Sequence, residues 1–214
     1  MNTVCLLVLA IAALLAAVVF KRHKSKRRKD LYTMTIGLDV KFEEYGPELQ
    51  LLENTGLPLF IEGYKGFGKN FLRFPQQEGF ESYFFDYICL AGGPEKQGSF
   101  CGTVALFDFA NAQFPVFYLA AENDLRKPAI RGFEPVDTSA FAGFPAGAGL
   151  YGSDSAVLRA FFKPETAALF KKEAGWSAQG AGRYLLLHKG SKLVSPGNYM
   201  GFVEAAKTMA FRLA

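Results

Sequence analysis

Residues 63–70 read Gly-Tyr-Lys-Gly-Phe-Gly-Lys-Asn, one residue short of the nucleotide-binding pattern G-x-x-x-x-G-K-[ST]. In that loop, backbone N–H groups wrap the phosphates, the hydroxyl binds magnesium, and a helix begins at once with its N-terminus facing the anion. Here Asn70 replaces the hydroxyl, and Pro75 stops any helix soon afterwards. Asp86 follows too closely for the crossover helix and parallel strand that a nucleotide-binding fold requires. We therefore predict a glycine-rich turn, and we expect no cofactor.

Acid–base catalysis would require two carboxylates, or a histidine, that converge on one pocket. Asp86, Asp108, Glu122 and Asp124 lie near the ends of predicted strands, and the first three are the candidates for such a role. Asp86 and Asp108 interrupt otherwise apolar strand faces, although solvent-facing positions and loop caps explain single carboxylates equally well. For His188, the sequence offers no serine or cysteine in a recognisable nucleophile pattern such as G-x-S-x-G. The sequence therefore shows no catalytic constellation.

The three cysteines, Cys5, Cys89 and Cys101, match neither a metal-binding pattern nor a disulfide framework. Cys89 and Cys101 belong to consecutive predicted strands and could face each other across a hairpin. In a cytoplasmic domain both thiols would normally stay reduced. We expect no metal site, and the pairing of these two thiols stays open.

The elements that must position these residues alternate in hydrophobicity or carry helix caps. Strands are predicted over 57–62, 83–90, 99–110 and 114–122, and two short strands over 176–190. A helix is predicted near 47–54, another after Ser153 or Asp154, a third from Pro164 to Gly175, and the last over 198–213. The 22 phenylalanines suit half-buried sheet faces better than a helical bundle. The expected fold class is α+β: an N-terminal transmembrane helix, then one domain whose largely antiparallel sheet is packed by a few helices, including the C-terminal one.

The transmembrane expectation comes from the start of the chain. Val4 to Phe20 is a segment of 17 residues without charge, glycine or proline. As a helix it would extend about 25 Å, at the short end of what spans a hydrocarbon core. A cleaved secretory signal, the alternative, would need a basic start that residues 1–3 lack. We predict a transmembrane anchor over 1–20, a basic juxtamembrane flank over 21–30 and a cytoplasmic α+β domain over 31–214.

A basic cluster follows the apolar segment directly. Its seven members are Lys21, Arg22, Lys24, Lys26, Arg27, Arg28 and Lys29. Such a cluster keeps its side of a membrane in the cytoplasm, so we predict a single-pass protein of the cell inner membrane with its N-terminus outside. The same cluster can bind anionic headgroups, at about 1 kcal/mol per basic residue near the surface.

The rest of the chain is not basic. Of the 24 Lys and Arg, 17 lie beyond residue 30, against 19 Asp and Glu, so that region has a formal charge of −2. Such a charge argues against binding the phosphate backbone of a nucleic acid. The expected partners are the lipid bilayer, anionic headgroups and an unidentified protein, and no nucleic acid.

One resemblance covers residues 57–207. It rests on an ordered set of segments: LPLFIEGYKGFGKNFLRF, FFDYICLAGG, GTVALFDF, FPVFYLAAEND, GLYGSDSAVLRAFF and GRYLLLHKGSKLVSPGNYMGFVEAA. This set resembles an uncharacterised family of bacterial proteins with an N-terminal membrane helix and a single α+β domain. The resemblance implies strand and turn positions around Asn70, and it carries no activity. The chain departs from the family at residues 140–152, where small residues replace charged and bulky ones.

Two classes of function remain open. The first is a membrane-anchored protein whose cytoplasmic domain is a non-enzymatic binding or interaction module at the inner leaflet, where tethering raises the local concentration of a weak binder. The alternative is a membrane-tethered, hydrolase-like enzyme that uses Asp86, Asp108 and Glu122. The absence of a catalytic constellation in the sequence favours the binding module.

Overall fold

The structure is a computed structural model of the chain. It describes residues 25–47, 49–62, 64–77, 79–90, 99–122, 124, 130, 132–139, 141 and 143–214. The chain divides into two compact units, Met1–Leu38 and Asp39–Ala214. In the first unit, residues 25–35 form a helix, in which Thr35 Oγ1 donates a hydrogen bond to the carbonyl oxygen of Tyr32 (2.7 Å).

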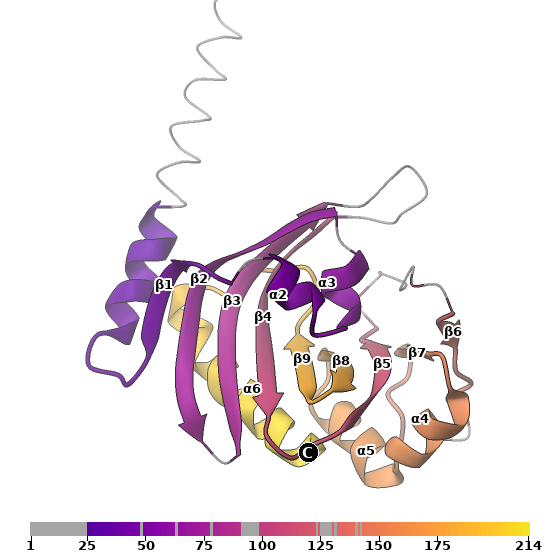
Figure 1. Ribbon diagram of the computed structural model, residues 1–214. Helices are drawn as coiled ribbons and strands as arrows, with labels where there is room; N and C mark the ends of the chain where they lie inside the picture. The colour runs from indigo at the N-terminus through magenta and orange to yellow at the C-terminus, as the bar shows by residue number, and fades with distance from the viewer. Residues whose placement is uncertain are drawn as a thin grey trace, which may run out of the picture. The chain divides into compact units, whose positions relative to one another are not determined.

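The second unit is built on one antiparallel sheet of nine strands in the order β1-β2-β3-β4-β9-β8-β5-β7-β6 (Figure 1). The strands are β1 (Lys41–Tyr45), β2 (Tyr64–Gln77), β3 (Phe80–Leu90), β4 (Phe100–Phe109), β5 (Phe114–Ala120), β6 (Glu134–Pro135), β7 (Gly149–Gly152), β8 (Ser177–Gly182) and β9 (Tyr184–His188). The hairpin β8–β9 inserts between β4 and β5, so strands that are consecutive along the chain become separated in the sheet.

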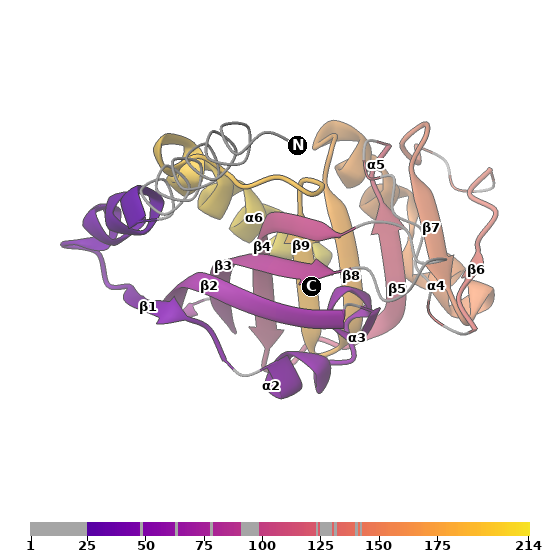
Figure 2. The same ribbon diagram turned by 90° about the horizontal axis from the view of Figure 1, so that it is seen from above.

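Helices cover both faces of this sheet. The helices are α2 (Leu49–Glu53), α3 (Pro58–Glu62), α4 (Ser155–Phe161), α5 (Pro164–Lys172) and α6 (Tyr199–Leu213), with a 3-10 turn, η1 (Pro196–Asn198). Figures 1 and 2 show α2 and α3 on one face, here the first face, and α6 on the opposite, second face.

Alternation along the central strands explains how both faces are buried. On β3, Tyr83, Phe85 and Tyr87 point to the first face, where Phe85 and Tyr87 join Phe60 of α3 in one hydrophobic cluster. The intervening Phe84 points to the second face and meets Phe202 of α6 (ring centroids 6.2 Å apart). The alternation predicted for 83–90 is therefore confirmed.

The later helices begin where their sequences indicate. Asp154 is the N-cap of α4, and its Oδ1 accepts hydrogen bonds from the backbone of Ala156 (2.9 Å) and Val157 (3.1 Å). Pro164 opens α5, where its missing N–H costs nothing. Helix α6 buries the predicted stripe, which comprises Tyr199, Phe202, Val203, Ala206, Ala210 and Leu213.

Two local expectations are wrong. Residues 58–62 form α3 rather than a strand, because Pro58 suits a first helical position and the neighbouring Leu57, Leu59 and Phe60 are all buried without alternation. The predicted glycine-rich turn around residues 64–70 is part of β2, a strand of 14 residues. Register shifts on both sides of Lys69 let the glycine-containing stretch stay in the sheet.

The expected fold class also needs correction. The α+β character and the antiparallel sheet are observed, and nine strands dominate the unit, but the described residues contain no N-terminal transmembrane helix. Within the described part of the chain, no helix has the length and apolar character needed to cross a membrane. The predicted anchor, residues 1–20, lies outside the described residues.

Candidate functional site

Asp86 is a buried structural carboxylate of the second face. Its side chain accepts hydrogen bonds from Asn70 Nδ2 (2.8 Å) and Thr103 Oγ1 (2.9 Å), and the residue is 3% exposed. The Thr103 hydroxyl also accepts from the backbone N–H of Val194 (2.9 Å). Asn70 has a positive φ of 52°, which asparagine tolerates better than most residues. Asp86 therefore ties the irregular part of β2 and the segment before α6 to the sheet.

The three candidate carboxylates do not converge. Asp86 pairs with Thr103 across β3 and β4, whereas Asp108 pairs with Glu81. Five residues separate the two pairs, so Asp86 and Asp108 point to opposite faces and stand about 17 Å apart along the strand direction. Glu122 is exposed and follows β5, which is separated from β4 by β9 and β8. The three candidates for an acid–base role are thus dispersed in the sheet.

A hollow on the first face contains the most varied chemistry of the described surface depressions. This α2 hollow has a volume of about 380 Å³ and lies between α2 and strands β1, β2, β3, β4 and β9. Leu51 and Leu52 of α2 and Leu106 of β4 give it apolar walls and floor. Gly46, Pro47 and Thr55 also line it, together with three aromatic rings and three charged groups: Phe71, Tyr83, Tyr184, Glu43, Arg73 and Asp108.

Every charged group of the α2 hollow is paired. Lys41 Nζ lies 2.6 Å from Glu43 Oε1, and Arg73 Nη2 donates to both oxygens of Glu81 (3.1 and 3.0 Å). Arg183 donates through Nε to Asp108. The strand register explains this arrangement, because Arg73 stands opposite Tyr83 and Asp108 stands between Glu81 and Tyr184.

Tyr83 and Glu81 influence each other's ionisation. The Tyr83 hydroxyl donates a short hydrogen bond to Glu81 Oε2, and this bond lowers the pKa of Glu81 below its ordinary value. Burial, reinforced by the same bond, raises the pKa of Tyr83 above its ordinary value. Both shifts move away from neutrality, so Glu81 stays charged and Tyr83 stays protonated near pH 7. Neither group is suited to exchange a proton there.

A second, buried polar cluster surrounds His188, whose neighbours the sequence did not reveal. His188 Nε2 lies 3.8 Å from Asp124 Oδ2, and Ser177 pairs with His188 in the β8–β9 ladder. Ser177 Oγ donates to Asp124 (2.8 Å) and accepts from the backbone of Ala121 (3.0 Å), while the Tyr118 hydroxyl donates to Asp124 (2.6 Å). The serine donates to the carboxylate itself and all these side chains are buried, so Ser177 is not arranged as a nucleophile. The cluster instead holds β5 and β8 together.

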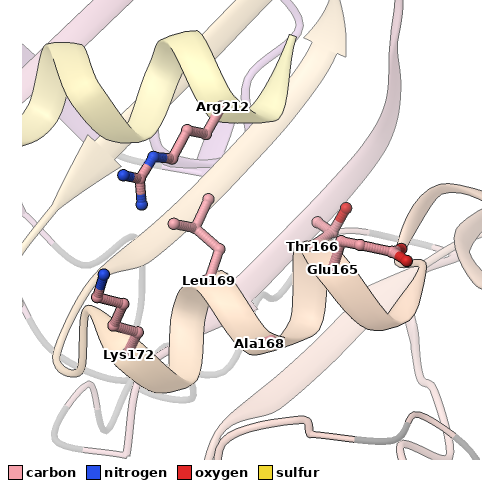
Figure 3. Close-up of a pocket in the computed structure, with 6 residues that line it drawn as sticks. All are labelled: Glu165, Thr166, Ala168, Leu169, Lys172 and Arg212. Atoms are coloured by element: carbon pink, nitrogen blue, oxygen red, sulfur yellow. The ribbon is translucent and has the colours of Figure 1, made fainter.

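A cleft between α5 and α6 is a weaker candidate for a binding site than the α2 hollow. It measures about 390 Å³, and Figure 3 shows Arg212 of α6 and Lys172 of α5 pointing into the same space beside Leu169, with Glu165 turned away. Lys172, Arg212 and Glu165 are all exposed, which is typical of a seam between surface helices.

The structure also shows where the cysteines and part of the basic cluster lie. Ile88 pairs with Cys101 and Cys89 with Phe100, so the two cysteines point to opposite faces of the sheet and do not face each other across the hairpin. Of the basic cluster, Lys26, Arg27, Arg28 and Lys29 belong to the helix over 25–35, whereas Lys21, Arg22 and Lys24 lie outside the described residues. Among the described side chains, no group of three or more His, Cys, Asp or Glu could hold a metal ion.

The domain fold is shared with a solved structure. The crystal structure of the mycobacterial trehalose monomycolate transport factor A, TtfA, matches with a TM-score of 0.60 and 12% sequence identity, over 90% of this chain and 94% of that one. At this identity the likeness shows the fold alone. No protein-family model matches the chain, and no curated protein matches it.

Of the residues in the α2 hollow, sequence analysis singled out only Asp108. Arg73, Tyr83 and Tyr184 of the lining, and Glu81 beside it, were missed, since each is an ordinary strand residue until the strands are placed next to one another in the sheet. One signal was present: Glu81 and Tyr83 stand two residues apart on a strand and therefore share a face.

Proposed function

We propose that the unit Asp39–Ala214 is a non-enzymatic binding module that works at the inner face of a membrane and binds its ligand in the α2 hollow. The observation that carries this proposal is the hollow itself, in which apolar, aromatic and paired charged side chains from six elements converge. Binding sites for small molecules typically combine an apolar lining with a few placed polar groups in this way.

Two further observations favour binding over catalysis. Only Asp108 of the three candidate carboxylates lines the hollow, and it is engaged by Arg183. The pKa shifts of Glu81 and Tyr83 point away from neutrality, the opposite of what a general base and a general acid need.

The basic cluster and the structural comparison support this proposal. The cluster over residues 21–29 suits an anionic surface, and a surface-bound module can use a weak site because its local concentration is high. The protein with the similar fold, TtfA, is a transport factor, and a binding module suits such a role without any catalytic step.

Thermal unfolding of the full chain in detergent micelles tests the proposal. The probes are sugars, sugar phosphates, amino acids and nucleotides, and the blocking variant is Leu51→Trp, because Leu51 is 59% exposed and lines the hollow. Ile61→Trp is the matched control, since it adds the same ring at an exposed position of α3. We expect one class of probe to raise the unfolding midpoint of the wild type and the control, but not that of Leu51→Trp.

Three results would contradict the proposal. The first is that no class of probe stabilises the wild type. The second is that Leu51→Trp responds to the probe like the wild type, which would place the site elsewhere. The third concerns the chemical fate of the probe. A stabilising probe should also be recovered unchanged by mass spectrometry after prolonged incubation. Its conversion would favour the alternative, an enzyme.

A further inference from the structure

We infer that the α2 hollow takes a neutral saccharide ring, an inference that rests on the proposed function and specifies its ligand. The first ground is charge balance. The three charged residues of the lining and their partners form three ion pairs: Lys41 with Glu43, Arg73 with Glu81, and Arg183 with Asp108. An anionic ligand bound to one of the arginines would also lie close to that arginine's carboxylate partner, and a cationic ligand bound to a carboxylate would lie close to its arginine. Neither gains electrostatically from a site whose net charge is zero.

The second ground is the unused hydrogen-bonding capacity of these pairs. A guanidinium has five N–H donors and a carboxylate accepts at about four lone-pair positions, far more than the pairs themselves use. The side chains of Arg73 and Arg183 are about half exposed, at 48% and 53%, so part of each guanidinium group faces solvent. A hydroxyl both donates and accepts. A polyhydroxylated ring can therefore bind carboxylate and guanidinium together without breaking an ion pair.

The third ground is the apolar part of the hollow. Leu52 and Leu106 lie beside the rings of Phe71, Tyr83 and Tyr184, which offers a surface for the C–H face of a sugar. The side chains of Tyr83 and Tyr184 are only partly buried. The volume of about 380 Å³ is near the lower end of the range for small-molecule sites, roughly 300–1,000 Å³, and suits one or two sugar rings.

Titration calorimetry and ligand-observed NMR of the full chain test this inference with glucose and maltose as neutral probes, and with glucose 6-phosphate and glucosamine as charged ones. We expect the neutral sugars to bind and the charged analogues to bind several-fold more weakly. Arg73→Gln should weaken maltose binding about tenfold, the effect of losing a hydrogen bond to a charged group. Lys171→Gln, an exposed change on α5, should bind like the wild type.

A second variant separates ligand contact from a loss of folding. Asp108→Asn leaves Arg183 without its charged partner and makes the hollow net positive. We expect its affinity for maltose to fall and its affinity for glucose 6-phosphate to rise above that of the wild type. A merely destabilised hollow would weaken both.

The saccharide could be free or could be a lipid headgroup, and vesicles distinguish these sources. Phosphatidylcholine vesicles with and without digalactosyldiacylglycerol are compared for the wild type and Leu51→Trp. Binding of free maltose, or a preference for the glycolipid that Leu51→Trp abolishes, supports the inference. If glucose 6-phosphate or glucosamine occupies the hollow more tightly than any neutral sugar, the inference is wrong while the binding module stands. If nothing blocked by Leu51→Trp binds, the proposed function fails first.

Discussion

Two carboxylates on β3 illustrate how position decides the role of a residue. Glu81 and Asp86 are five residues apart and therefore lie on opposite faces of the strand. Asp86 is 3% exposed and accepts hydrogen bonds from Asn70 and Thr103, so it holds strands and loops together. Glu81 lies at the partly open first face, where it fixes Arg73 and Tyr83 beside the α2 hollow. Only the second arrangement leaves polar groups within reach of a ligand.

The Tyr83–Glu81 hydrogen bond gives the stability of the domain a pH dependence. Because the pKa of Glu81 is lowered in the folded state, its contribution is present above the unfolded value of about 4.3 and is lost as pH falls through the folded value. We expect Tyr83→Phe to lower the free energy of unfolding by about 0.5–1 kcal/mol at pH 7, since partial exposure of Glu81 keeps the effect small. The difference from the wild type should shrink as pH falls below about 4.

Urea unfolding at a series of pH values provides the measurement. Tyr45→Phe is the control, because Tyr45 is 64% exposed and should change nothing. A difference for Tyr83→Phe that stays constant from neutral to acidic pH would show that the hydroxyl does not act through Glu81.

At the scale of elements, periodicity and capping predicted most of the strands and late helices, and failed where segments are short or irregular. Alternation identified β3 and β4, and Asp154 and Pro164 marked the starts of α4 and α5. Residues 58–62 gave no such signal, because a short segment that is buried on every side has the same hydrophobic pattern whether it forms a helix or a strand. The glycines of β2 suggested a turn, whereas the bulge at Asn70 absorbs the irregularity within the strand.

Replacement of two glycines in regular elements by alanine should change the free energy of unfolding in opposite directions. A Cβ on Gly180 of β8 would lie 2.4 Å from a Phe117 ring carbon and 2.9 Å from the Cβ of Phe114, which cannot swing away. We expect Gly180→Ala to cost about 1–3 kcal/mol of unfolding free energy by overpacking. Gly201 lies on the exposed side of α6 with nothing within 4 Å of its added Cβ, so Gly201→Ala should stabilise by up to about 1 kcal/mol.

Thermal or urea unfolding of both variants beside the wild type checks this pair. If Gly180→Ala proved as stable as Gly201→Ala, the close packing of β8 against β5 would be wrong.

At the scale of the whole molecule, the candidate site depends on topology that local pattern cannot reveal. The α2 hollow draws on residues from Glu43 to Tyr184, and Tyr184 reaches it only because the β8–β9 hairpin inserts beside β4. The sequence predicted β8 and β9 as neighbouring strands but contained no signal for their place in the sheet. It therefore identified Asp108 and not the residues around it. The basic cluster, in contrast, is visible in the sequence because its seven charges fall within nine consecutive residues.

The basic cluster should make membrane binding of the full chain depend on lipid charge. Near an anionic surface each lysine or arginine contributes about 1 kcal/mol, so Lys26→Gln or Lys29→Gln should weaken binding about fivefold. The measurement is co-sedimentation with phosphatidylcholine vesicles, with and without phosphatidylglycerol, at low salt. A variant with all seven basic residues changed to glutamine should bind both vesicles equally, and added salt should bring the wild type toward that behaviour by screening. Lys171→Gln, far along the chain, is the control. Equal binding of the wild type to both vesicles at low salt would remove the electrostatic argument for a membrane surface, while the α2 hollow would keep its own test.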